Sequence, residues 1–193
     1  MAANTTSQLT WRAALAASHQ ALTTVVAAVG DDQWDAPTPC SQWTVTQVVQ
    51  HAAGDQLAYA ATLGAGDGPD YDPFAPSGTI DGSPSALVKV AIERTAAAWS
   101  RHEADTAPTP LPQGELPVTS AAGACALDAA VHAWDIAIAT GQPSPLTDDL
   151  SAFLLDVAKE IVEPLRQWGA YAAAGATTAD DSATVQLLRY LGR

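Results

Sequence analysis

Apolar residues recur at helical spacing along five long segments of the chain. In the first segment, from about Ser7 to Val29, leucines and valines approximate one helical stripe, and Gly30 ends it. Similar segments cover about 44–63, 83–103, 119–140 and 147–168, and a short one covers 184–193. Valine and isoleucine are scattered along these segments and do not gather in short alternating runs. The pattern therefore predicts an all-α protein.

Local signals set the limits of several of these predicted helices. Thr44 and Gln47 have the spacing of a capping box, which predicts a sharp helix start. Pro84 stands in the first turn of the third segment, where proline is favoured. Gly141 follows the fourth segment and predicts its end. Pro164 lies inside the fifth segment, so we expect that helix to kink or to end early.

The segments between the predicted helices are rich in proline and glycine. Two prolines in "GDDQWDAPTPCSQW" (30–43) exclude regular structure there. The connection "TAPTPLPQGELP" (106–117) is also rich in proline. Residues 64–82, dense in Gly, Pro and Asp, form a loop of unusual length for a compact domain. Such a loop is either a functional lid or a surface excursion.

Length and charge narrow the class of protein. The chain has 193 residues, with no internal repeat and no second segment of different composition, so we expect residues 1–193 to form a single domain. Its 21 acidic and 8 basic residues give a formal net charge of -13, which disfavours binding to nucleic acid. No long uninterrupted apolar run predicts a membrane helix, and the first residues do not resemble a signal peptide. With two cysteines only, a cytoplasmic location is the simplest interpretation.

One helical segment, "CALDAAVHAWDIAIATG" (125–141), carries polar groups on an otherwise apolar surface. Asp128, His132 and Asp135 stand at positions i, i+4 and i+7, and Cys125 lies on the same side. The neighbouring stripe is apolar and consists of Leu127, Val131, Trp134 and Ile138. A helix that is apolar nearly all round is normally buried. Buried ionisable groups need partners, and coordination of a metal ion is one way to provide them.

A metal site needs at least one further ligand from another part of the chain. His51 lies among small and apolar residues of the second helical segment and is the first candidate. His19, inside the first segment, and His102, at a polar helix end, are weaker candidates. The spacing alone also fits a core histidine that is hydrogen-bonded to a neighbouring carboxylate.

Three stretches of the sequence resemble a known family. "TPCSQWTVTQVVQHAAG" (38–54) and "VHAWDIAIATG" (131–141) are similar to two signatures of the mycothiol-dependent maleylpyruvate isomerase-like proteins, a branch of the DinB-like metal-binding superfamily. "LLRYLGR" (187–193) is similar to the usual ending of its single-domain members. The resemblance implies a DinB-like four-helix bundle with an additional short C-terminal helix.

The resemblance also implies a divalent metal held by three side chains, which fall here on His51, Asp128 and His132. The superfamily often has Glu or His where this chain has Asp128. Because aspartate is one methylene shorter than glutamate, a bridging water is an alternative to direct coordination. The maleylpyruvate isomerases generally carry an additional C-terminal domain, so the resemblance implies the bundle and the metal site but not that substrate.

Four other residues could support such a site. Asp135 could orient a metal-bound histidine, or it could fix a helix–loop junction, and we favour the second role. The same choice applies to Asp55, four residues after His51. Trp43 and Trp134 match the signatures and could contact substrate, although core packing is the commoner role.

The two cysteines are weaker candidates for chemistry. Cys40 precedes a predicted helix, where a thiol can be reactive, but most lone cysteines behave as small apolar residues. Cys125 is better placed to line a pocket than to attack a substrate.

Three functions fit these residues. The first is a metal-dependent enzyme that uses a low-molecular-weight thiol such as mycothiol, of isomerase or S-transferase type, on a small electrophilic substrate. The second is a metal-dependent hydrolase with Asp55 or Asp135 as the base, and the third is a non-catalytic metal or small-molecule binding protein. Zinc is the first choice of metal, and nickel, iron and manganese also suit these ligands. A homodimer is an option because DinB-like bundles often dimerise.

Overall fold

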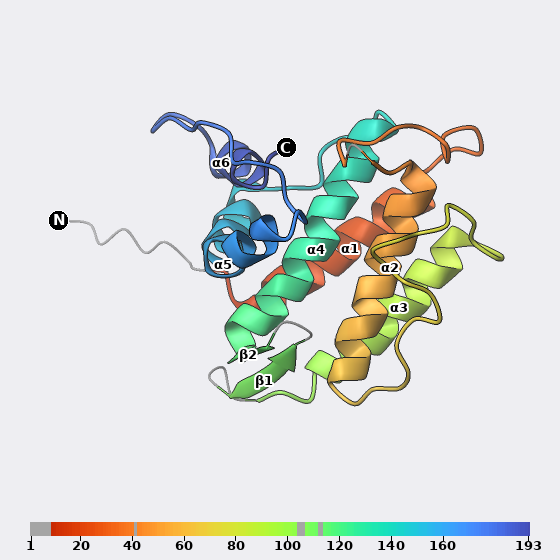
Figure 1. Cartoon of the computed structure of the whole chain (residues 1–193), viewed down its shortest axis with the longest axis horizontal. Coiled ribbons are helices and arrows are strands. Elements are labelled where there is room, and N and C mark those ends of the chain that lie inside the picture. Colours follow the sequence, from red (N-terminus) through yellow and green to blue (C-terminus); the bar gives the residue numbers. More distant parts are fainter. Residues whose placement is uncertain (1–8, 41, 104–106, 112–113) are drawn as a thin grey trace.

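The computed structural model describes residues 9–40, 42–103, 107–111 and 114–193. Within these ranges the chain forms α1 (Trp11–Ala27), α2 (Val45–Thr62), α3 (Pro84–Trp99), β1 (Pro108–Leu111), β2 (Gly114–Pro117), α4 (Val118–Ala139), α5 (Asp148–Gln167) and α6 (Ala183–Tyr190) (Figure 1). The strands form one small antiparallel hairpin. The prediction of an all-α protein is therefore confirmed.

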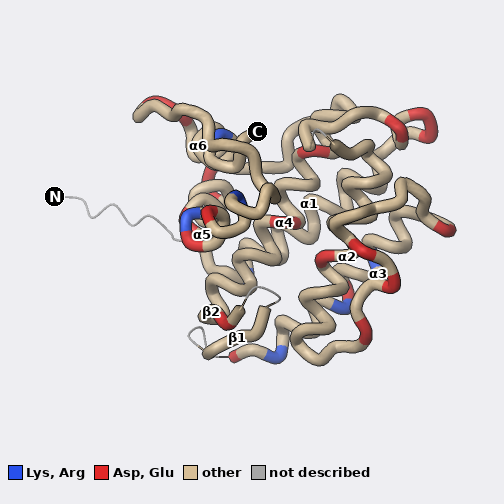
Figure 2. The backbone as a smooth tube through the Cα atoms, in the orientation of Figure 1, with Lys and Arg blue, Asp and Glu red and all other residues tan. Residues whose placement is uncertain are grey.

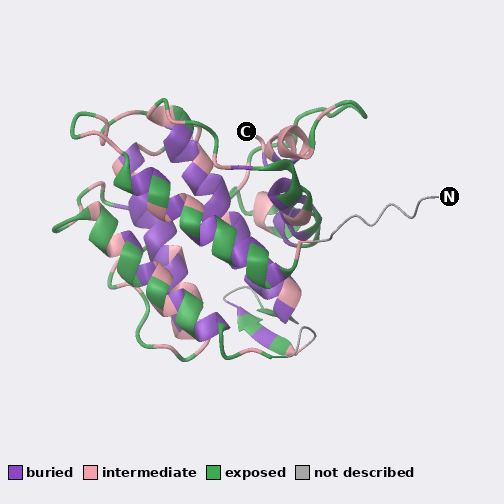
Figure 3. Ribbon diagram, turned by 180° about the vertical axis from the view of Figure 1, so that it is seen from behind, coloured by how far each residue is buried: buried purple, intermediate pink, exposed green. Residues whose placement is uncertain are grey.

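Helices α1, α2, α3 and α4 form a four-helix bundle. Helix α1 packs against α4 and α3, and α2 packs against the same two helices, while α5 packs on the far side of α4 and carries α6 (Figure 1). Two hydrophobic clusters meet on α4, one shared with α5 and α6 and the other with α2 and α3. Figure 3 shows the molecule from behind, and there the exposed residues form one stripe along each outer helix. Helix α4 therefore lies between the other bundle helices and α5, at the centre of the protein.

The central position of α4 explains its composition. Within the described ranges it is the one helix long and apolar enough to cross a membrane, yet 83% of its apolar window is buried inside the protein. Packing against helices on both sides thus accounts for its apolar character. The acidic residues are spread along loops and helices, and some of them lie on α4 itself (Figure 2).

The predicted helix limits are largely confirmed. The Thr44 hydroxyl accepts a hydrogen bond from the Gln47 amide at 3.4 Å, and the Gln47 side chain accepts one from the Thr44 amide at 3.0 Å. Pro84 begins α3, as expected. Gly141, with φ of 72°, follows the end of α4 in a conformation that favours glycine.

Pro164 does not end α5 early. The helix continues beyond the proline to Gln167, close to the predicted limit at residue 168. Helix α3 ends at Trp99, four residues before the predicted limit of Glu103. The predicted start of the first helix at Ser7 lies outside the described residues, and α1 begins at Trp11.

The second proline-rich connection contains the hairpin, which the sequence pattern did not predict. Pro108 pairs with Pro117, and Pro110 pairs with Glu115. Proline lacks the amide proton that a central strand must donate, but both strands of a two-stranded sheet are edges. The hairpin therefore tolerates its prolines and leads the chain directly into α4.

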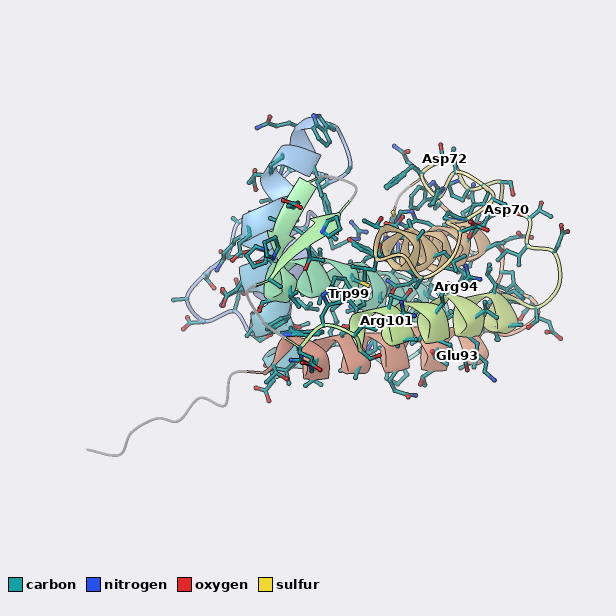
Figure 4. The ribbon with its side chains drawn as sticks, turned by 90° about the horizontal axis from the view of Figure 1, so that it is seen from below. Asp70, Asp72, Glu93, Arg94, Trp99 and Arg101 are labelled. Carbon is teal, nitrogen blue, oxygen red and sulfur yellow. The ribbon has the colours of Figure 1, made fainter. Side chains whose placement is uncertain are left out.

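The long loop of residues 64–82 packs on α2. The Tyr71 hydroxyl donates to the Gln50 carbonyl at 2.8 Å, and the Gln50 side chain accepts from the Gly78 amide at 3.0 Å. The acidic residues Asp70 and Asp72 mark this loop on the side of α2 opposite α1 (Figure 4). The loop thus forms a second layer over the part of α2 that carries His51.

Candidate metal centre

The structure brings His51, Asp128 and His132 together in the interior of the bundle. His51 comes from the middle of α2, while Asp128 and His132 lie one turn apart on α4. Asp128 Oδ1 lies 3.5 Å from His51 Nε2 and 3.4 Å from His132 Nε2, and one ligand atom from each residue lies within 4.8 Å of the others. Among the described residues, this is the one group of His, Cys, Asp or Glu side chains that could hold a metal ion.

The ring of His51 is oriented by the loop over α2. Its Nδ1 lies 2.9 Å from the Pro73 carbonyl oxygen, which can only accept a hydrogen bond, so Nδ1 carries the proton. In the neutral ring, Nε2 therefore has a lone pair, and this lone pair is the one that approaches Asp128. His51 is 5% exposed, so water has little access to replace such a partner.

The ring of His132 is oriented by a carboxylate from its own helix. Its Nδ1 lies 3.0 Å from Asp135 Oδ2, which leaves Nε2 to approach Asp128. Asp135 is fully buried and also accepts two hydrogen bonds from the Arg193 guanidinium, at 2.8 and 2.9 Å. Asp135 therefore contacts a histidine of the site and also links α4 to the residues after α6.

Asp128 is oriented by a buried glutamine. Gln56 Nε2 donates to Asp128 Oδ2 at 3.4 Å and to the Cys125 carbonyl at 3.2 Å. The side-chain oxygen of Gln56, Oε1, accepts hydrogen bonds from His19 Nε2 at 2.9 Å and from the Cys125 thiol at 3.1 Å. With its amide fully used, Gln56 holds one oxygen of Asp128 and leaves Oδ1 for the two histidines. His19 is thus a core histidine outside the metal group.

The carboxylates around His51 change its proton affinity. Burial lowers the pKa of His51, but the hydrogen bond to Asp128 and the charges of Asp128 and Asp55 outweigh it and raise the pKa to about 9. Asp55 Oδ2 lies 3.8 Å from His51 Nε2. Burial and the nearby Asp128 raise the pKa of Asp55 to about 7. The negative charge of the site therefore favours a bound cation. Without a metal ion, that cation is a proton on His51.

Aromatic side chains surround the histidines on the loop side. The Trp43 ring lies 4.6 Å from the His51 ring and 6.5 Å from the His132 ring. Phe74, from the loop of residues 64–82, meets His51 edge-on at 5.5 Å although it is 69% exposed. Trp134 instead packs against the core cluster that α4 shares with α5 and α6.

Sequence reasoning missed two residues of this site. Gln56 lies five residues after His51, and Arg193 lies 58 positions after Asp135, within the terminal "LLRYLGR". Both are ordinary residue types without a spacing signal. For Arg193, the similarity of its segment to a family ending was the one available hint.

Comparisons with known proteins agree with this architecture. The sequence model of the family described as the mycothiol maleylpyruvate isomerase N-terminal domain matches residues 15–137. Uncharacterized proteins of two Mycobacterium tuberculosis strains, CDC 1551 / Oshkosh and ATCC 25618 / H37Rv, are each 32% identical over 147 residues, or 76% of this chain and 76% of theirs.

A solved structure shares the fold. The crystal structure of a histidine-to-alanine mutant of the mycothiol-dependent maleylpyruvate isomerase matches with a TM-score of 0.62 and 16% identity, over 86% of this chain and 72% of that one. This likeness confirms the predicted all-α, DinB-like fold. The sequence match extends over most of the bundle, and the chain therefore belongs to the mycothiol maleylpyruvate isomerase N-terminal domain family.

Proposed function

We propose that this protein binds a divalent transition metal through His51, Asp128 and His132 and uses it in a thiol-dependent reaction on a small electrophilic substrate. The observation that carries this proposal is the convergence of two imidazole Nε2 atoms on one carboxylate oxygen, at 3.5 and 3.4 Å. All three atoms can coordinate a metal ion once it displaces the protons bound there, and the burial of the site excludes most of the water that could separate them.

The spacing of the donor atoms supports a metal ion. Two ligands at about 2.0–2.1 Å from a tetrahedral zinc lie about 3.4 Å apart. Asp128 Oδ1 lies at 3.5 and 3.4 Å from the two Nε2 atoms. Three protein ligands leave a coordination position open, as in catalytic zinc sites. Zinc is our first choice, and nickel, iron and manganese suit the same donors.

The bound metal would supply a charge that lowers the pKa of a coordinated thiol and so favours the thiolate. Side chains beside the metal would have the other roles in the reaction. Asp55, 3.8 Å from His51 Nε2, is the nearest further carboxylate and could accept a proton from a group bound beside His51. Trp43 and Phe74 could cover that group on the loop side and limit the access of water.

The two cysteines support a thiol from outside the chain. Both are free, Cys125 is fully buried, and burial raises its pKa well above the usual value. Burial also raises the pKa of Cys40. Neither thiol is poised to act as a thiolate nucleophile near neutral pH. Free thiols also fit the cytoplasmic location that we propose.

Mycothiol is the thiol that the family description names, and we propose it as the co-substrate of this protein. A thiolate that adds to an activated double bond, permits rotation about the resulting single bond and is then eliminated produces an isomer and regenerates the thiol. A thiolate that displaces a leaving group, which departs with the bonding pair, produces a thioether. The first course would make this protein an isomerase and the second an S-transferase.

Asp55 supports a second candidate, a metal-dependent hydrolase. A carboxylate beside the site could take a proton from an attacking water. Hydrolysis of an ester or amide in the absence of any thiol would favour this candidate, while a reaction that requires thiol would exclude it.

Elemental analysis of the purified protein tests the metal centre. We expect about one equivalent of transition metal in the parent and in the control His102→Ala, which removes a histidine outside the group, and none in His51→Ala. Circular dichroism should give the same helical content for all three proteins. Equal metal content in the parent and in His51→Ala would overturn the assignment of the site.

The thiol is tested on the cobalt-substituted parent. Mycothiol that coordinates the ion should add a thiolate-to-cobalt absorption band in the near ultraviolet, and His51→Ala should not develop this band. A cobalt-loaded parent whose spectrum is unchanged by mycothiol would overturn the thiol part of the proposal and favour the hydrolase or the binding protein.

A further inference from the structure

A buried ion pair joins the residues after α6 to the central helix. Arg193 Nε donates to Asp135 Oδ1 at 2.8 Å, and Arg193 Nη2 donates to Asp135 Oδ2 at 2.9 Å. The Arg193 side chain is 9% exposed and the Asp135 side chain 0% exposed. Two parallel hydrogen bonds between a guanidinium and a carboxylate fix both the distance and the plane of the pair.

The same carboxylate holds a proposed metal ligand. Asp135 Oδ2 accepts a hydrogen bond from His132 Nδ1 at 3.0 Å, and His132 Nε2 lies 3.4 Å from Asp128. On the basis of the proposed metal centre, we infer that Arg193 is a positioning residue of that centre. It holds the Asp135 carboxylate in place, so that Asp135 fixes the orientation and the Nδ1–H tautomer of His132 and presents Nε2 to the ion.

Asp135 needs this second partner because it is fully buried. A buried carboxylate with one imidazole partner keeps unused acceptor positions that no water fills. The two hydrogen bonds from the Arg193 guanidinium fill those positions and hold the carboxylate where Oδ2 faces His132 Nδ1.

The backbone after α6 is shaped to deliver Arg193 to this position. Gly192 has φ of 77°, and a Cβ there would come within 2.7 Å of the Ala172 side chain, so only glycine fits this turn. The Arg193 amide donates to the Leu188 carbonyl at 2.8 Å and closes the turn. From α5, Arg166 donates to the Tyr190 and Ala172 carbonyls and ties the turn to the linker before α6.

The inference is specific to Arg193 because α6 carries a second arginine in a different setting. Arg189 is 41% exposed and binds Asp181 at 2.8 Å and the Ala176 carbonyl at 2.9 Å. Both partners belong to the segment before α6 and neither contacts Asp135 or His132 in the described structure. Arg189→Ala therefore removes a tie of α6 without removing the link to the metal centre.

The test compares zinc affinity in Arg193→Ala, Arg193→Gln, Arg193→Lys and the control Arg189→Ala, by competition with a chromophoric chelator. Loss of a group that supports a metal-bound histidine typically weakens binding by about 10- to 100-fold, and we expect this for Arg193→Ala and Arg193→Gln. Lysine restores the charge but not the paired geometry, so Arg193→Lys should recover part of the affinity. Arg189→Ala should stay within about twofold of the parent.

Two spectroscopic readouts separate positioning from general loosening of α6. The visible spectrum of the cobalt-loaded protein should change in Arg193→Gln and not in Arg189→Ala. In the metal-free protein, nitrogen-15 NMR of the histidine side chains should report the Nδ1–H tautomer for His132 in the parent and a mixture of tautomers in Arg193→Gln.

Three results would overturn the inference. The first is parental affinity and an unchanged cobalt spectrum in Arg193→Gln, which is also the decisive variant if Arg193→Ala does not fold. The second is an equal loss of affinity in Arg189→Ala. The third is an unchanged His132 tautomer in metal-free Arg193→Gln. A parent that binds no metal would instead overturn the proposed function, while the tautomer measurement would still decide the role of Arg193.

Discussion

The two histidines of the candidate centre present the same atom, Nε2, but opposite kinds of partner hold them. His51 on α2 donates its Nδ1 proton to a backbone carbonyl of the loop of residues 64–82. His132 on α4 donates its Nδ1 proton to Asp135, which is fully buried and paired with Arg193. One half of the site therefore depends on a surface loop and the other on an ion pair inside the protein.

This difference predicts different consequences for damage to each half. A carboxylate behind a histidine increases the basicity of the ring and fixes its orientation, whereas a carbonyl provides orientation with a weaker charge effect. A buried ion pair that loses one partner leaves an uncompensated charge, while a loop contact that is lost can be replaced by water. We expect the α4 half to be the costlier one to break.

Substitution of either histidine by alanine should have the largest effect, and the same effect, on the amount of bound metal. His51→Ala and His132→Ala each remove one of three donor atoms, and we expect both to reduce metal content to background. Equilibrium dialysis against zinc, with His102→Ala as the matched control, measures this directly. A variant that retained stoichiometric metal would exclude its histidine from the site.

Asp135→Ala tests the buried half. It leaves the Arg193 guanidinium buried without its partner, so we expect a loss of about 3–5 kcal/mol in the free energy of unfolding. Urea denaturation of the metal-free protein is the measurement, since bound metal would add its own stabilisation. A loss below about 1 kcal/mol, the range of exposed ion pairs, would mean that the pair is not buried in solution.

The acid sensitivity of His19 tests the third support of the site, the Gln56 network behind Asp128. Burial outweighs the hydrogen bond to Gln56 and lowers the pKa of His19 from 6.5 to about 4. The pKa of His19 is lower in the folded protein than in the unfolded chain. The stability that depends on neutral His19 is therefore fully present above pH 6.5 and is lost as the pH falls toward 4. Between pH 7 and pH 5, the parent should lose about 2 kcal/mol more stability than His19→Gln.

Urea denaturation at the two pH values measures this difference. The comparison with His19→Gln cancels the contributions of the other titrating groups, as the glutamine can still hydrogen-bond but does not titrate. Equal losses in the two proteins would mean that His19 is solvated and does not support Gln56.

Parts of this organisation were readable from the sequence because they depend on near neighbours. The capping box of Thr44 and Gln47 and the stop at Gly141 are local, and their predictions are confirmed. The pairing of residues 108–111 with residues 114–117 was missed, and of the two outcomes expected at Pro164 the early end of α5 did not occur. The prolines of the two strands are tolerated because both strands are edges, which a count of prolines does not reveal.

The site divides in the same way. The pair Asp128 and His132 stands out at helical spacing, and His51 stands out among small and apolar residues, with the family resemblance in support. Gln56 and Arg193 reach the site only through the packing of α2 and α6 against α4, so no local pattern identifies them. The sequence offered two roles for Asp135, to orient a histidine or to fix a helix–loop junction. The contact with His132 fits the first role and the contact with Arg193 fits the second, and the sequence does not reveal that Arg193 lies beside Asp135.

Asp128→Ala distinguishes direct coordination from a water bridge. If Asp128 Oδ1 is a ligand, zinc affinity should fall at least tenfold, on the order of 1.4 kcal/mol, because two histidines alone hold the ion. Competition with a chelator gives the affinity, and circular dichroism checks that the bundle is intact. An unchanged affinity would place Asp128 outside the coordination shell.

Tyr71→Phe gives the smallest expected effect and tests the loop half. The Tyr71 hydroxyl donates to the Gln50 carbonyl at 2.8 Å and helps to hold the loop whose Pro73 carbonyl orients His51. Loss of one such hydrogen bond costs about 1 kcal/mol of stability, and because the carbonyl of Pro73 stays in reach, zinc affinity should fall by no more than about threefold. Urea denaturation and chelator competition measure the two effects. A loss of affinity as large as that of Arg193→Gln would mean that the loop positions its histidine as firmly as the buried ion pair does, and the contrast between the two halves of the site would then be wrong.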